Sequence, residues 1–145
     1  MAAMRKRGSK VFLSYARRDR EPAQKIGDRL RKAGFDVWDP DREILPGANF
    51  GAEINSALQS ADALVVLISP EAMRSRDVSY EIEYALTAEH LRGRLIPVVL
   101  HPAKDAPWIL NRFESIRYES PTRAGDQIAE LLNRPAHVPQ TRSPA

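Results

Sequence analysis

Residues 63–68 (ALVVLI) form a run of six apolar side chains that no polar residue interrupts. A strand with one face in water alternates apolar and polar residues, so this run predicts a strand that is covered on both faces. Strands of that kind lie in the centre of a parallel sheet, with helices packed on either side. The turn-forming pair Ser69-Pro70 ends the run, and the chain is therefore expected to fold as an α/β protein.

Strand and helix patterns alternate five times along the chain. The expected strands are residues 10–15, 35–38, 63–68, 94–100 and 115–118; the expected helices are residues 21–33, 50–61, a segment from residue 78, and residues 124–132. This alternation predicts a doubly wound, flavodoxin-like five-stranded parallel sheet of order 2-1-3-4-5, with right-handed crossovers and helices on both faces.

Three local features refine this prediction. Gly34 is placed to end the first helix, and Asn49 is placed to cap the second. Pro97 cannot donate a ladder hydrogen bond, so the fourth strand is expected toward one edge of the sheet. Residues 101–112 are rich in proline, and Trp108, with the two residues after it, is expected to anchor them by packing.

Composition limits the class of protein. With 145 residues, 43% hydrophobic and 28% charged, the chain is expected to form one globular domain at residues 10–134, between a flexible basic N-terminus (1–9) and a disordered, proline-containing tail (135–145). The net charge of +3 comes from these ends, because the rest of the chain is acidic; we therefore rank nucleic-acid binding lowest.

Several kinds of chemistry are excluded or not expected. The absence of cysteine excludes disulfides and thiolate nucleophiles, and the three histidines have no metal-ligand spacing, so no metal is expected. No apolar run approaches the roughly 20 residues of a membrane span, and no signal peptide is recognisable. We therefore expect a soluble, cytoplasmic protein that does not bind membranes.

Polar residues gather where strands one and three end, at the switch point where open α/β sheets bind ligands. Ser14 and Tyr15 end strand one, and either can contact a ligand. Arg17 and Arg18 follow; they can pair with phosphate or stack on a base, or be ordinary loop residues. Ser69 ends strand three, where substrate contact and helix capping are equally open.

Two further candidates follow strands two and three. Trp38 either lines a pocket or packs beneath the loop that follows it. Glu81 is expected in the first turn of the helix after strand three, off the apolar stripe of Val78, Ile82 and Ala85. The connection of residues 39–49 is long for a strand-to-helix loop, and loops of this length tend to be functional.

The chain resembles the Toll/interleukin-1 receptor (TIR) domain family, and in particular its bacterial single-domain members. The resemblance covers about residues 10–133 and rests on five segments in order. These are VFLSY at 11–15, GFDVWDPDREILPG at 34–47, ALVVLISP at 63–70, YEIEYAL at 80–86 and RLIPVVL at 94–100.

The resemblance implies two functions. Many TIR domains cleave NAD⁺, with a glutamate followed by an aliphatic residue early in the helix after strand three; Glu81-Ile82 matches. Family enzymes commonly have an aromatic residue four positions before it, where this chain has Asp77, so Tyr80 or Tyr84 would have to supply the stacking surface. NAD⁺ is then the substrate, and no cofactor is expected.

The second implied function is self-association through residues 39–49, the BB loop. The residues expected to act there are Asp39, Asp41, Arg42, Pro46 and Gly47. The implied partners are another TIR domain or a partner effector protein.

Cleavage of the bond between nicotinamide and ribose requires few catalytic groups. The transition state resembles an oxocarbenium ion, which a carboxylate can stabilise or attack, and nicotinamide leaves as a neutral molecule that needs no general acid. Glu81 must be ionised, and the positive end of its helix is expected to favour this. Glu83 points about 200° away around the helix, so a carboxylate pair is not expected.

Four functional hypotheses are compared. The first is a TIR NAD⁺ glycohydrolase or cyclase in antiphage defence, which yields nicotinamide with ADP-ribose or a cyclic ADP-ribose signal. The alternative is a non-enzymatic TIR adaptor or host-mimicking effector. A nucleoside deoxyribosyltransferase would share the fold and the glutamate. A phosphoacceptor receiver is excluded, because Ala16-Arg17 and Ser69-Pro70 occupy its acidic positions. Kinases and NTPases are excluded separately, because no glycine-rich phosphate loop is present.

Overall fold

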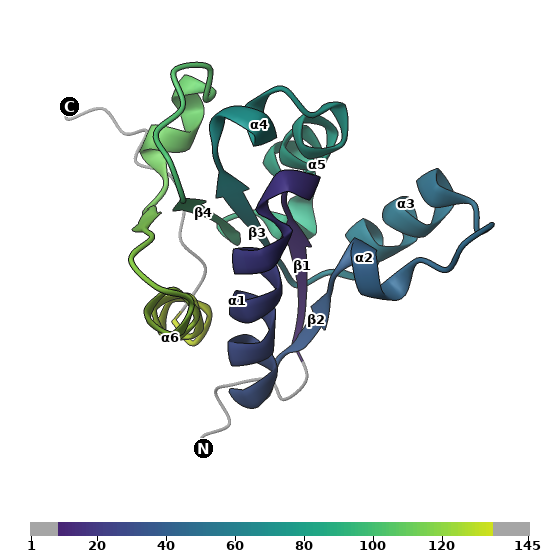
Figure 1. Cartoon of the computed structure of the whole chain (residues 1–145), viewed down its shortest axis with the longest axis horizontal. Helices are drawn as coiled ribbons and strands as arrows, with labels where there is room; N and C mark the ends of the chain where they lie inside the picture. The colour runs from purple at the N-terminus through teal and green to yellow at the C-terminus, as the bar shows by residue number, and fades with distance from the viewer. Residues whose placement is uncertain (1–8, 135–145) are drawn as a thin grey trace.

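Five parallel strands form one sheet in the order β2-β1-β3-β4-β5 in the computed structural model, which describes residues 9–134 (Figure 1). The strands are β1 (Lys10–Ser14), β2 (Asp36–Trp38), β3 (Ala63–Ile68), β4 (Leu95–Val99) and β5 (Ile116–Arg117). The predicted order is confirmed. The predicted flexible N-terminus and the tail at 135–145 lie outside the described residues, apart from Ser9.

The apolar run that ends at Ile68 is the central strand. All six residues of β3 are buried, and β1 and β4 pair with it on either side. Ser14 pairs in register with Val66, so the carboxyl ends of β1 and β3 lie next to each other. The chain connects β1 outward to β2 and β3 outward to β4, which makes this pair of ends the switch point.

Helices cover both faces of the sheet (Figure 1). On one face, α1 (Arg20–Lys32) and α6 (Pro121–Leu132) pack over alternate side chains of the strands, such as Leu13 and Val65. On the other, α3 (Phe50–Ser60), α4 (Pro70–Met73) and α5 (Arg76–Thr87) pack over Phe12 and Leu64. The chain also contains α2 (Pro40–Glu43), η2 (Arg17–Asp19), η3 (Glu89–Leu91) and η4 (Trp108–Arg112).

The capping residues act as expected. Asn49 accepts a 3.0 Å hydrogen bond from the backbone N–H of Ala52 at the start of α3. Gly34 follows α1 with φ +99°, a conformation that favours glycine. The last helix begins three residues before its expected start, because Ser120 caps it by accepting a bond from the N–H of Arg123, with proline in the first turn.

As predicted, β4 lies toward one edge of the sheet, with only the two-residue strand β5 outside it. The strand lies between β3 and β5, but β5 pairs only with Val98 and Val99. Pro97 pairs with β3 at Val66 and lies outside the short β5 ladder, so the missing N–H costs no hydrogen bond on that side.

The predicted packing anchor of residues 108–110 is confirmed for Leu110, which is buried, and for Ile109, which packs against the core, but it is wrong for Trp108. Its side chain is 69% exposed, while Leu110 and Phe113 are buried. These two residues are three apart at the end of η4, and three residues make one turn of a 3₁₀ helix, so both face the core. Two short helices, α2 and α4, also form where only connecting segments were expected.

Candidate active site

Glu81 lies deeper in its helix than predicted. Helix α5 begins at Arg76, and the Ser75 side chain caps it by accepting a 3.2 Å bond from the N–H of Val78. Glu81 is therefore in the second turn, and the acidic residue of the first turn is Asp77. The capping serine was the sequence signal for this earlier start.

Glu81 also belongs to the buried face of α5, contrary to the prediction that it lies off the apolar stripe. Residues 78, 81, 82 and 85 follow the spacing of one helical face, and all four are buried. Glu81 is 3% exposed. A carboxyl group so placed must find a polar partner, because an unpartnered buried charge is costly.

The partner of Glu81 is Ser14 at the end of β1. The Ser14 hydroxyl, which is fully buried, donates a 2.6 Å hydrogen bond to Glu81 Oε1. Burial, with a smaller contribution from the charge of Asp77, raises the pKa of Glu81 to about 7, although the Ser14 bond acts to lower it. The helix dipole acts mainly within the first turn, so it does not hold this carboxyl group in its ionised form as expected.

A second buried pair mirrors the first. The Ser69 hydroxyl, at the end of β3, donates a 2.5 Å bond to Asp19 Oδ2. Ser69 Oγ also accepts from the N–H of Ala72, so it caps α4 as one reading of the sequence proposed. Asp19 is 6% exposed and was missed by the sequence analysis, although it is the one acidic residue among the arginines of η2.

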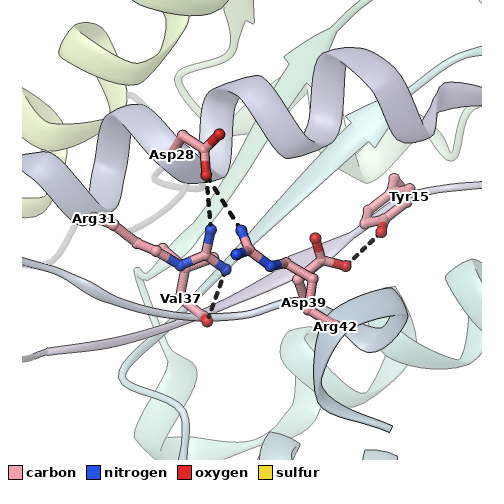
Figure 2. Close-up of polar contacts among 6 residues, drawn as sticks. All are labelled: Tyr15, Asp28, Arg31, Val37, Asp39 and Arg42. Atoms are coloured by element: carbon pink, nitrogen blue, oxygen red, sulfur yellow. Dashed lines mark hydrogen bonds and ion pairs between the residues drawn. The ribbon is translucent and has the colours of Figure 1, made fainter. Parts of the chain in front are cut away.

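A third link joins the end of β1 to the BB loop. The Tyr15 hydroxyl donates to Asp39 Oδ1 (Figure 2). The same oxygen accepts a 3.0 Å bond from the N–H of Asp41 and so caps α2. Burial and the bond to Asp39 raise the pKa of Tyr15. Asp39 is fully buried, and its Oδ2 is the one buried side-chain polar atom without a partner in residues 9–134.

The remaining loop contacts are exposed. Arg31 and Arg42 both donate to Asp28 Oδ1 at 3.2 Å, which tethers α2 to α1 (Figure 2). Arg20 and Asp41 make another ion pair, with 3.2 Å between Arg20 Nη1 and Asp41 Oδ2. Exposed pairs of this kind add little stability.

The tip of the BB loop is open to solvent. Pro46 and Gly47 are exposed, and Gly47 has φ +87° with open space where a Cβ atom would lie. Two large apolar side chains are also exposed, Leu45 of the loop at 70% and Phe50, the first residue of α3, at 47%. Exposed apolar side chains of this size mark a surface that can bind another protein.

The other predicted site residues do not all gather around Glu81. Arg17 and Arg18 are exposed on η2. Trp38 is partly buried and stacks on Phe12, with 4.9 Å between ring centroids, so it packs beneath the loop. Tyr84 makes an edge contact with His90, which follows the carboxyl-terminal end of α5.

Tyr80 is the nearest aromatic residue along the chain to Glu81. Its side chain is 47% exposed, and its hydroxyl donates a 2.6 Å bond to Asn55 Oδ1 on α3. Asp77 is exposed one helical turn before Glu81.

Across residues 9–134, no three histidine, aspartate or glutamate side chains come together as a metal site requires. Within the same range, no helix has the length and apolar character to cross a membrane.

The fold and this geometry define a flavodoxin-like α/β protein with a buried carboxyl group at the switch point of its sheet. The chain belongs to the TIR domain family, which matches residues 11–132.

Individual relatives are more distant. The chain is 27% identical over 97 residues to the 2′ cyclic ADP-D-ribose synthase BtTIR of Bacteroides thetaiotaomicron, an alignment that covers 65% of this chain and 33% of that protein. The chain thus spans about a third of the length of this relative.

Solved structures agree on the fold. The TIR domain of the Toll-related receptor TRR-2 from Hydra magnipapillata superposes with a TM-score of 0.66 at 20% identity, over 84% of this chain and 90% of that one. A metazoan TIR-STING receptor from C. gigas, solved in complex with 2′,3′-cGAMP, superposes with a TM-score of 0.73 at 25% identity, over 86% of this chain and 39% of that one.

Proposed function

We propose that this protein cleaves the bond between nicotinamide and ribose in NAD⁺, with Glu81 as the catalytic residue. The observation that carries the proposal is the burial of Glu81 against Ser14 at the switch point of a TIR fold. The similarity to a 2′ cyclic ADP-D-ribose synthase supports the same chemistry. NAD⁺ is the substrate in this proposal, and no cofactor takes part.

The ionised form of Glu81 performs the reaction. Its carboxylate stabilises or attacks the oxocarbenium-like ribose as neutral nicotinamide leaves. With a pKa of about 7, a substantial fraction of the free protein carries this charge at neutral pH. The Ser14 hydroxyl holds the carboxylate in one orientation and favours its ionised form.

The fate of the ribose decides the product. Attack by water gives ADP-ribose, and attack by a hydroxyl group of the same molecule gives a cyclic ADP-ribose. Both products need the same first bond cleavage, so one catalytic carboxylate serves either outcome.

The test is nicotinamide release from NAD⁺ by purified protein. We expect Glu81→Gln, which preserves the shape of the side chain, to lower release by about 10²–10³-fold, as loss of one key electrostatic group does elsewhere. Glu83→Gln is the matched control, because Glu83 lies on the same helix with an exposed side chain. Equal release by wild type and Glu81→Gln contradicts the assignment. Chromatography of the products separates hydrolysis from cyclisation.

A second function, assembly with another TIR domain or a partner effector protein, is favoured by the exposed tip of the BB loop. The observation is the exposure of Leu45 and Phe50, because exposed apolar side chains of this size are typical of protein contact surfaces. We expect Leu45→Ser to weaken concentration-dependent assembly in light scattering. Trp108→Ser, equally exposed outside the loop, is the control. If both variants assemble like wild type, this role is contradicted.

The two functions are compatible, because assembly can regulate the enzyme. Activity per molecule that rises with protein concentration, and falls in Leu45→Ser, is the expected sign of coupling. The biological setting in this proposal is cytoplasmic antiphage defence; a host-mimicking effector is the alternative when nicotinamide release is absent.

A further inference from the structure

Glu71 lies between two arginines that come from the two loops at the switch point. Its Oε2 atom is 3.7 Å from Nη1 of Arg18, on η2 after β1, and 3.8 Å from Nη2 of Arg74, after α4. The side chains of Arg18 and Arg74 are 75% and 65% exposed, and that of Glu71 is 32% exposed. Two positive groups from separate segments thus converge on one oxygen atom.

The buried hydrogen bond between Ser69 and Asp19 holds together the two segments that carry Arg18 and Glu71. Asp19, next to Arg18 in the chain, accepts the 2.5 Å bond from Ser69, which lies two residues before Glu71. Both partners are at least nine-tenths buried, and Ser69 also caps α4. Buried hydrogen bonds that hold the supporting segments give a surface site a defined geometry.

We propose that Arg18 and Arg74 bind the pyrophosphate of the dinucleotide substrate, and that Glu71 stands in for this anion in the free protein. This inference rests on the proposed NAD⁺ cleavage and adds a binding site to it. Arg74 and Glu71 are new to the site, because neither the sequence motifs nor the family resemblance pointed to them.

The ion pairs of Glu71 with Arg18 and Arg74 are long, as expected of a site at which another anion can replace the carboxylate. Strong charge-assisted bonds between guanidinium and an anionic oxygen measure about 2.7–2.9 Å, well below the distances to Glu71. Because both guanidinium groups share one oxygen atom of Glu71, most of their N–H groups do not donate to this carboxylate. A pyrophosphate offers several acceptor oxygens and can meet both guanidinium forks.

The position along α5 fits the chemistry of the substrate. The pyrophosphate of NAD⁺ is attached through the 5′ carbon of the ribose whose bond to nicotinamide is cleaved. Arg74 lies two residues before Arg76, the first residue of α5. Glu81 lies five residues after Arg76, which is about 7.5 Å along the helix axis. A ribose against Glu81 therefore has Arg74 on the amino-terminal side of the same helix.

Binding is measured without turnover, in the Glu81→Gln background, by calorimetry with ADP-ribose, inorganic pyrophosphate and adenosine. We expect Arg18→Ala with Arg74→Ala to weaken ADP-ribose binding about tenfold or more, because charged hydrogen bonds are lost. Glu71→Gln is expected to tighten it several-fold, since it removes the competing anion. Adenosine binding should change in none of the variants.

Arg92→Ala is the matched control. Arg92 is 66% exposed and pairs with Glu89 at 3.9 Å, an arrangement like that of Arg74 and Glu71 but distant in sequence from the switch point. The proposal is overturned if the double variant binds ADP-ribose like wild type, or if Glu71→Gln fails to tighten it. Binding of inorganic pyrophosphate without ADP-ribose also overturns it, because the site then serves another polyphosphate.

These outcomes are separate from those of the proposed function. Loss of nicotinamide release from wild-type protein, with ADP-ribose binding intact and sensitive to Arg74, contradicts catalysis but retains the anion site. Normal release with no effect of the arginine and Glu71 substitutions on binding contradicts the anion site alone.

Discussion

Ser14 Oγ donates a 2.6 Å hydrogen bond to Oε1 of Glu81, 67 residues later in the chain. The bond joins the end of β1 to the helix that follows β3, so it crosses the switch point. It opposes the effect of burial, which alone would raise the pKa of Glu81 further. The protonation state of the candidate catalytic group therefore depends on a residue of the neighbouring strand.

Ser14→Ala is expected to move the pH dependence of nicotinamide release to higher pH. The substitution removes a bond that favours the ionised carboxylate, so a smaller fraction of Glu81 is active at neutral pH. The measurement is kcat/KM from pH 5.5 to 9, which reports the free protein. Ser79→Ala, exposed on α5, should leave the profile unchanged. A uniform fall in rate, with the midpoint unmoved, would count against this role.

Asp77→Asn should move the same midpoint in the opposite direction. Asp77 lies one turn before Glu81, and its charge raises the pKa of that carboxyl group. Neutralising it is expected to bring the rise in kcat/KM to lower pH. Because Asp77 is exposed, the difference from wild type should shrink as salt is added. A difference that persists at 1 M salt would point to another cause.

Asp77→Trp tests the position at which family enzymes commonly have an aromatic residue. We expect a lower KM for NAD⁺ than in wild type, because an indole ring adds a stacking surface for nicotinamide. Asp77→Asn is the control that removes the charge without adding a ring. If both variants have the same KM, stacking at this position contributes nothing.

The strands and helices of the sheet could be predicted from the sequence, because buried segments carry a recognisable pattern of apolar residues. The six apolar residues that end at Ile68 identify β3, and Gly34 and Asn49 mark helix ends by local rules. These signals depend on neighbours in the chain. The strand order was predicted as the flavodoxin-like arrangement that suits five alternating strand and helix units with right-handed crossovers.

The site was predicted less completely, because its contacts are long-range. The sequence pattern predicts Glu81 in a first turn, off the apolar stripe, because a charged residue on a buried face needs a partner that local sequence does not reveal. Asp19 was missed for the same reason; its partner Ser69 is 50 residues away. Trp108 failed differently: the size of a side chain does not say which face of a short helix it occupies.

Glu81→Gln should change how stability depends on pH. Burial raises the pKa of Glu81 from its ordinary value of 4.5 to about 7, so between these values the unfolded chain loses a proton that the folded protein keeps. The free energy of unfolding of wild type should therefore fall, relative to Glu81→Gln, by up to about 3 kcal/mol as pH rises through this range, and then stay level.

Urea unfolding at a series of pH values from 4 to 8.5 measures this difference. Glu83→Gln provides the matched control, because its exposed carboxyl group should give a curve parallel to wild type. Parallel curves for wild type and Glu81→Gln would mean that the pKa of Glu81 is not raised by folding.

Tyr15→Phe should destabilise the protein by about 1–3 kcal/mol, because it takes a hydrogen-bond donor from a buried carboxyl group. Asp39 is fully buried, and its second oxygen lacks a hydrogen-bond partner within the described residues. Loss of the Tyr15 bond drawn in Figure 2 therefore leaves this carboxyl group with only the bond from the N–H of Asp41. Tyr80→Phe is the matched control: it removes one hydroxyl bond, to Asn55, from a side chain that is 47% exposed, and should cost about 0.5 kcal/mol or less. Urea midpoints measure both, and amide hydrogen exchange should show faster opening of residues 39–49 in Tyr15→Phe alone. Equal losses in the two variants would mean that the bond between Tyr15 and Asp39 does not hold the BB loop to the sheet.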